Sequence, residues 1–226
     1  MKFSTYCSLL ALVLPAAAHA ANASNPSPVA VFLNFEEQPS ASLLSAMRDE
    51  VSLIMGPAGL TFDWRTDRPA ITGETFADLI VLNFRGDCNA FNGGRPPRAE
   101  RFFAYSPEAQ AAALASTATD GDRVLPFVAV ECDQLRRFVT PSLYPADKVD
   151  LVFGRAIGRV VAHEMYHIFA GTKHHGKSGV AQRSYRRTDL TSPLFRFTSD
   201  EAELLRSYAG TLSPIEPGIA ELAHQQ

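Results

Sequence analysis

Five residues between positions 163 and 175 are of types that bind metal ions: His163, Glu164, His167, His174 and His175. The first three form a His-Glu-x-x-His pattern inside an apolar stretch that is expected to be helical. Residues four apart on a helix lie on one face, about 6 Å apart at Cβ, so two such imidazoles can reach one zinc ion at roughly 2.0–2.1 Å. Glu164 is rotated by about 100° from His163. Its carboxylate is therefore expected beside the metal ion rather than on it.

This pattern predicts hydrolysis of a peptide bond by a water molecule that zinc activates. Zinc lowers the pKa of such a water to about 7 and polarises the carbonyl, and Glu164 would be the general base. Chance gives the bare pattern in roughly 1% of chains of this composition, so the alternative that His163 and His167 are ordinary helix histidines stays open. Tyr166 and Tyr185 are candidates for stabilising an oxyanion, although packing explains either residue more simply.

The third zinc ligand has three candidates. A catalytic zinc usually keeps three protein ligands and one open position. Gly171 can end the helix in a left-handed turn and send the chain back toward the metal, which suits either His174 or His175. Glu201 opens a later helix and is the other candidate, although it also occupies the fourth position of a capping box that begins at Thr198.

The extended sequence resembles the metzincin clan of zinc peptidases, whose pattern is His-Glu-x-x-His-x-x-Gly-x-x-His. Gly171 and His174 keep the Gly-x-x-His spacing, but both lie one residue later than the pattern requires. No methionine follows Met165, so the methionine turn of the clan is absent. The resemblance implies a single zincin-like α+β domain, a Zn²⁺ cofactor and a peptide or protein substrate. In the thermolysin-like clan the third ligand is a glutamate on a later helix, which would correspond to Glu201.

The stretch AHEMYHIFAGTKHHGKSGVA also looks like that of a group of uncharacterised exported bacterial metallopeptidases. In that group the third histidine belongs to a His-Gly/Ser-x-x-Gly-Val-Ala segment, which is residues 175–181 here. The resemblance therefore favours His175 over His174. It covers roughly residues 150–210 and does not extend clearly to the part of the chain before them.

A second function remains open, namely an exported zinc-binding module without catalysis. The helix would be the same, but a fourth protein ligand would close the zinc site. His174 together with His175, or His175 together with Glu201, would supply that ligand.

The first twenty residues are typical of a secretory signal peptide. Lys2 gives a positive start, residues 9–14 an apolar core, and Ala-His-Ala at 18–20 a cleavage site. Residues 21–28 have the composition of a linker. We therefore expect an exported protein, periplasmic or secreted, and no later stretch reaches the roughly 20 apolar residues needed for stable membrane insertion.

The charge of the chain is close to neutral. The net charge is −3, and it becomes −4 without Lys2, which argues against a nucleic-acid partner. Residues 29–212 suffice for one domain, which we expect to be a monomer, followed by a flexible tail at residues 213–226. Cys88 and Cys132 are the only cysteines outside the signal segment and predict a disulfide. Two separate buried thiols are the alternative.

The apolar periodicity predicts a mixed sheet with helices, and substrate lying along an edge strand. Pro126 indicates an edge strand or a bulge, Asp150 is a possible cap of the active helix, and residues 120–122 read as a turn. The expected elements are strands at 29–35, 61–65, 77–84 and 124–131 and helices at 40–55, 150–170 and after Thr198, with a short helix after Ser106.

Overall fold

Five strands form one mixed sheet, in the order β2-β1-β3-β5-β4. The first four strands in this order are parallel, and β4 is antiparallel to β5 at one edge. The strands are β1 (Val29–Glu37), β2 (Phe62–Arg65), β3 (Leu79–Asp87), β4 (Ala115–Asp120) and β5 (Arg123–Glu131). This computed structural model describes residues 28–66, 78–90, 113–143 and 148–212. The signal segment, nearly all of the linker, the short helix after Ser106 and the tail lie outside the described residues.

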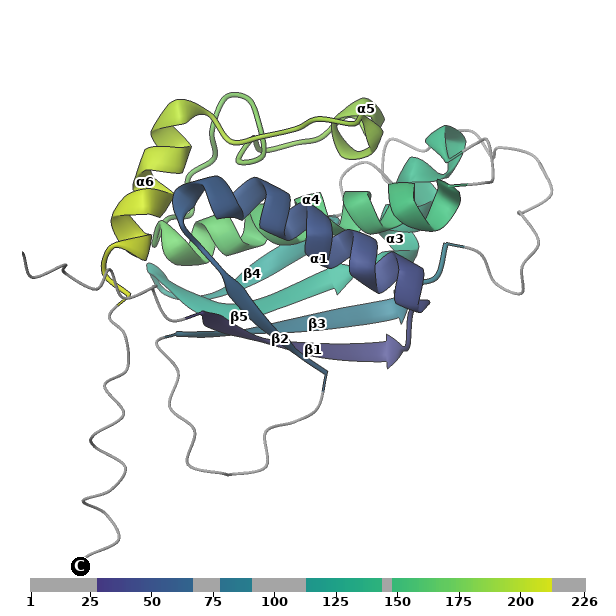
Figure 1. Ribbon diagram of the computed structural model, residues 1–226, viewed down its shortest axis with the longest axis horizontal. Coiled ribbons are helices and arrows are strands. Elements are labelled where there is room, and N and C mark those ends of the chain that lie inside the picture. The colour runs from purple at the N-terminus through teal and green to yellow at the C-terminus, as the bar shows by residue number, and fades with distance from the viewer. Residues whose placement is uncertain (1–27, 67–77, 91–112, 144–147, 213–226) are drawn as a thin grey trace, which may run out of the picture.

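Two long helices, α1 and α4, lie side by side across the same face of the sheet (Figure 1). The single α+β domain with a mixed sheet is as the sequence predicts. The helices are α1 (Ala41–Met55), α3 (Cys132–Val139), α4 (Val149–Phe169), α5 (Arg187–Thr191) and α6 (Ser199–Ala209), with 3₁₀ turns η1 (Gly56–Ala58) and η3 (Thr140–Ser142). Within the described ranges, no helix combines the length and the apolar character that crossing a membrane requires.

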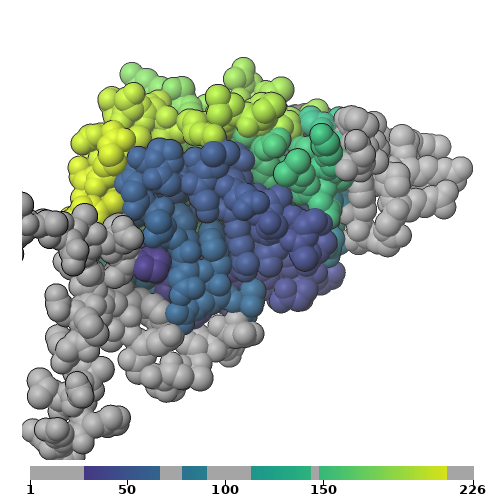
Figure 2. Space-filling model, in the orientation of Figure 1, coloured from purple at the N-terminus to yellow at the C-terminus, as the bar shows by residue number. Residues whose placement is uncertain are grey.

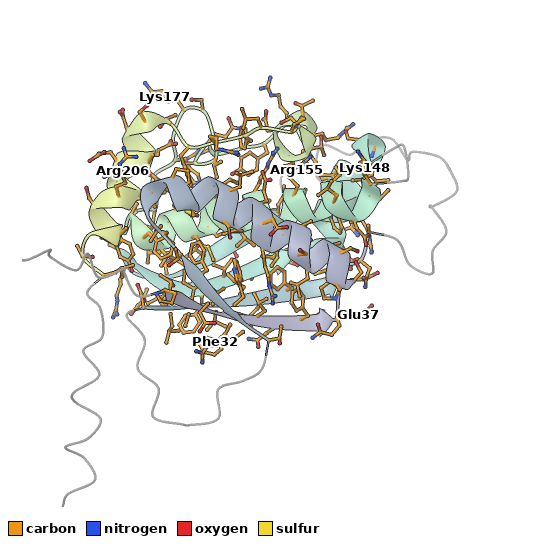
Figure 3. The ribbon with its side chains drawn as sticks, in the orientation of Figure 1. Phe32, Glu37, Lys148, Arg155, Lys177 and Arg206 are labelled. Atoms are coloured by element: carbon orange, nitrogen blue, oxygen red, sulfur yellow. A yellow bond between two sulfur atoms is a disulfide. The ribbon has the colours of Figure 1, made fainter. Side chains whose placement is uncertain are left out.

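The core lies between the sheet and the two helices. On β3, Ile80, Leu82 and Phe84 alternate toward the helices and are almost fully buried, as a strand period of two requires. Phe32 of β1 lies on the opposite face of the sheet, away from the helices (Figure 3). From the viewing side of Figure 2, α1 covers the middle of α4. Most residues of α4 are buried, and Phe153, near the start of this helix, is fully buried.

The starts of α1 and α6 follow local capping signals, whereas the start of α4 does not. The Ser40 hydroxyl accepts a hydrogen bond from the backbone N–H of Leu43 at the start of α1. Thr198 and Glu201 form the expected capping box of α6. Asp150 is not the cap of α4, because the helix already begins at residue 149 and Asp150 instead accepts hydrogen bonds from the hydroxyls of Ser40 and Ser42.

The strand β4 and the helices α3 and α5 have no counterpart among the sequence-based expectations. Pro126 lies in β5, which is an interior strand, so the edge position proposed for it is wrong. The bulge is correct, because the β4–β5 register shifts between Thr117 and Thr119, opposite residues 125–127. The expected turn is present at Gly121, whose φ is +56°.

The predicted disulfide between Cys88 and Cys132 is present. Their Cα atoms are 4.9 Å apart and both residues are fully buried. The bond joins the chain just after β3 to the first residue of α3, across 44 positions of sequence.

Candidate metal centre

His163 and His167 lie one turn apart on α4 and face the same point. Each is only 7% exposed. Their Nε2 atoms are 3.1 Å apart and their rings are nearly perpendicular. Two nitrogens bound to one tetrahedral zinc at 2.0–2.1 Å would lie roughly 3.3–3.4 Å apart. The observed separation is therefore close to that of a shared zinc ion.

The other ring nitrogen of each histidine is held by a backbone carbonyl. Nδ1 of His163 lies 2.8 Å from the Val180 oxygen, and Nδ1 of His167 lies 2.8 Å from the Thr172 oxygen. A carbonyl only accepts, so each Nδ1 must carry the proton. Both Nε2 atoms then present lone pairs to each other, which repel unless a cation lies between them. Backbone carbonyls support metal-binding histidines in this same way.

His175 completes a group of three. Its ring stacks on His163 with centroids 5.2 Å apart and meets His167 edge-on at 4.8 Å. One ligand atom from each histidine lies within 4.8 Å of the other two, and among the described residues this is the group of His, Cys, Asp or Glu side chains that could hold a metal ion.

The other two candidates for the third ligand are placed elsewhere. His174 and His175 are both exposed, but His174 lies outside the converging group, and its backbone N–H donates to the Thr172 hydroxyl. Oε2 of Glu201 accepts from the backbone N–H of Thr198 in the capping box. The structure therefore brings His175, rather than His174 or Glu201, to the two helical histidines.

The loop after α4 returns toward the helix because of two local features. Gly171 adopts the left-handed conformation with φ +56°, as glycine readily does after a helix. The Thr172 N–H donates to the His167 carbonyl, and the Gly176 N–H donates to the Ala181 carbonyl. These contacts fix the loop on both sides of the triad residue that it carries.

Glu164 is held between α4 and the edge strand. Its side chain is buried, with 6% of the residue exposed. Oε2 accepts a hydrogen bond from Oγ1 of Thr117, 2.6 Å away, on β4. Sequence reasoning missed Thr117, because the segment ASTATD has no apolar alternation that would reveal a strand; its β-branched threonines were the available signal.

Burial shifts the pKa values of these groups in the direction that favours the neutral form of each side chain. It lowers the pKa of His163 to about 4 and also lowers the pKa values of His167 and His175. The three imidazoles are therefore neutral near pH 7, as metal ligands must be. Burial raises the pKa of Glu164, and the hydrogen bonds from Thr117 oppose that shift.

An open cleft of about 460 Å³ lies between β4 and α4, with the three histidines and Glu164 in its wall. Thr119 of β4, Val160 of α4 and Arg183 from the following loop also line it. The cleft therefore places an edge strand directly beside the candidate metal centre.

The two tyrosines singled out in the sequence are both engaged in packing. The Tyr185 hydroxyl donates to the Val180 carbonyl that also accepts from His163, and its ring meets His163 edge-on at 5.6 Å. Tyr166 is buried against Phe197. Tyr185 lines the cleft and supports His163, whereas Tyr166 belongs to the core.

Comparison with solved structures finds a similarity to archaemetzincin from Methanopyrus kandleri. The TM-score is 0.47 and the sequence identity 13%, and the alignment covers 81% of this chain and 96% of that chain. No protein-family model matches the sequence, and no curated protein sequence matches it.

Proposed function

We propose that this protein is an exported zinc-dependent peptidase. The single observation that carries the proposal is the arrangement of His163 and His167. Their Nδ1 atoms lie on backbone carbonyls, and their Nε2 atoms face each other at 3.1 Å. His175 is the third member of the ligand set. Glu164, beside the set and in the wall of the cleft, is the general base.

The donor set fits zinc. Three neutral imidazoles suit zinc, and also nickel or cobalt. Three ligands leave one position of a tetrahedral zinc open, as in catalytic rather than structural sites. When bound there, zinc supplies a Lewis acid that polarises a carbonyl and makes water more acidic. The non-catalytic alternative requires a fourth protein ligand, and within the described residues neither His174 nor Glu201 joins the group.

Glu164 would move the proton. Its carboxylate lies in the cleft wall, one residue from His163 and largely shielded from solvent. It can accept a proton from the attacking water and return it to the leaving amine.

The edge strand would hold the substrate. Within the described sheet, β4 pairs only with β5 and leaves its other side toward the cleft. An extended peptide can add to such an edge through main-chain hydrogen bonds. The scissile carbonyl would then lie beside Glu164 and the three histidines.

Two further features support export. Residues 1–20 have the composition of a signal peptide. The Cys88–Cys132 disulfide is of a kind that persists in oxidising compartments. A periplasmic or secreted monomer that acts on peptides or proteins is the form that we propose.

The variant Glu164→Gln tests the peptidase assignment. We expect it to keep zinc and to lose hydrolysis by about 10²–10⁴-fold on any peptide that the wild-type protein cleaves in a library. Glu203→Gln, at an exposed position on α6, is the matched control and is expected to keep the wild-type rate. A Glu164→Gln protein that hydrolyses at the wild-type rate would remove Glu164 from the mechanism.

A further inference from the structure

The Thr117 hydroxyl donates a hydrogen bond to the Glu164 side chain, which also has a backbone hydrogen bond to Thr117. Its Oγ1 lies 2.6 Å from Glu164 Oε2 and 3.2 Å from the Glu164 backbone oxygen. The two residues are 47 positions apart in sequence. The bond therefore joins the edge strand β4 to the active helix α4 at the residue next to His163.

The irregular pairing of β4 with β5 explains how Thr117 reaches this place. Thr117 pairs with Val128, whereas Thr119 pairs with Val124, so three residues of β5 lie opposite one residue of β4. Such irregularities re-aim side chains and occur next to active sites. Thr117 is half-buried toward α4, while its neighbours on either side along the strand are exposed.

We propose that Thr117 is a positioning residue for Glu164, and that its hydroxyl fixes the general base in the orientation that hydrolysis needs. This inference rests on the proposed function. Glutamate has several rotatable bonds, and a free side chain on a helix would sample several orientations. A hydrogen bond from a hydroxyl to a carboxylate is short and strong, so the bond from Oγ1 to Oε2 restricts the orientations that the Glu164 carboxylate can adopt.

The position of Thr117 on β4 adds a second consequence. The same strand would pair with the extended substrate. The strand β4 would therefore position both the general base, through Thr117, and the scissile carbonyl. A misplacement of about 1 Å at a reacting group can reduce a rate by about 100-fold. Loss of the hydroxyl should therefore affect turnover much more than substrate affinity.

A structural role alone would give a different result. If Thr117 only packs β4 against α4, the isosteric variant Thr117→Val would preserve its effect and Thr117→Ser would disturb it. If Thr117 acts through its hydroxyl, Thr117→Ser keeps the function and Thr117→Val loses it. The exposed Thr61, just before β2 on the far side of the sheet, provides the matched control Thr61→Val.

The test uses the zinc-loaded full-length protein and two readouts. The first is kcat and KM on a cleaved peptide. The second is the dissociation constant for acetohydroxamate, which chelates zinc and hydrogen-bonds to a neighbouring carboxylate. Both readouts are measured for wild type, Thr117→Val, Thr117→Ser and Thr61→Val. The hydroxamate dissociation constant is also measured for Glu164→Gln and for the double variant Glu164→Gln/Thr117→Val. Zinc content is measured for every protein.

We expect Thr117→Val to lower kcat and hydroxamate affinity by about tenfold, with KM and zinc content within about twofold of wild type. Thr117→Ser and Thr61→Val should stay within about threefold of wild type. In the Glu164→Gln background, Thr117→Val should have no further effect on hydroxamate affinity. An equal loss in both backgrounds, or a serine variant as impaired as the valine variant, would overturn the inference.

Failure of the proposed function gives a separate result. A wild-type protein that holds zinc and binds hydroxamate, but cleaves no peptide, would overturn the peptidase assignment. The hydroxamate comparison would still decide the role of Thr117. A wild-type protein that holds no zinc would overturn both proposals.

Discussion

Nε of Arg159 donates a hydrogen bond to Oε1 of Glu50 at a distance of 2.7 Å, and the two side chains are 0% and 6% exposed. Arg159 lies one turn before His163 on α4. Its other nitrogens donate to the backbone oxygens of Asp189 and Ser192, at 2.6 and 2.7 Å. One buried guanidinium therefore ties α4 to α1 and to the segment that follows the loop carrying His175.

Replacing Arg159 is expected to destabilise the fold strongly. Arg159→Met should lower the free energy of unfolding by about 3–5 kcal/mol, because it leaves Glu50 buried with only the longer contact to Arg155, at 3.6 Å. Urea denaturation measures this loss. The double variant Arg159→Met/Glu50→Leu should lose less than the single variant. A single variant within about 1 kcal/mol of wild type would contradict this account of the contact.

Gly158 controls how closely α4 approaches α1. A Cβ added there would lie 2.8 Å from the Met47 backbone oxygen and 2.9 Å from Glu50 Cβ. Gly158→Ala should therefore force the helices apart and cost about 1–3 kcal/mol of unfolding free energy. Gly56→Ala is the control, because its φ is −54° and nothing lies within 4 Å of an added Cβ. Equal melting temperatures for the two variants would show that the close approach is relaxed at little cost.

Asp87 should make stability depend on pH in the acid range. Burial raises the pKa of Asp87, but hydrogen bonds from the Asn89 backbone and from Arg136 outweigh burial and hold the pKa below its usual value. The folded state therefore binds fewer protons than the unfolded state near pH 4. The stabilisation is complete above the unfolded pKa of about 3.9 and disappears as the pH falls through the folded pKa.

The variant Asp87→Asn isolates this contribution. Unfolding free energies measured between pH 7 and pH 3 should fall less steeply for Asp87→Asn than for wild type, and Arg136→Met should flatten the slope in the same way. If both variants keep the full wild-type slope, the acid sensitivity arises from other carboxylates.

The parts of the fold that the sequence predicted are those with local signals. The Thr198–Glu201 pair marked the start of α6 by its capping box. The apolar run of β3 and the helical periodicity of α1 marked buried elements. The strand β4 gave no such signal, because its residues ASTATD are small or polar and acquire a role only by pairing with β5.

In the candidate site, too, local patterns predict some residues, whereas others depend on the three-dimensional fold. The spacing of His163, Glu164 and His167 is a property of one helix and could be read from the sequence. The choice between His174 and His175 depends on the loop geometry after Gly171. Thr117 depends on a contact between a strand and a helix 47 positions apart, which no local pattern contains.

The most direct test of the account is the metal content of the protein after extensive dialysis, compared among wild type, His167→Ala, His175→Ala and His174→Ala. We predict about one zinc per chain in wild type and in His174→Ala, and a loss of zinc in the other two variants, because of the three replaced residues His167 and His175 belong to the group of three histidines and His174 does not. Absence of zinc from the wild-type protein, or an equal loss in His174→Ala, would contradict the proposed metal centre.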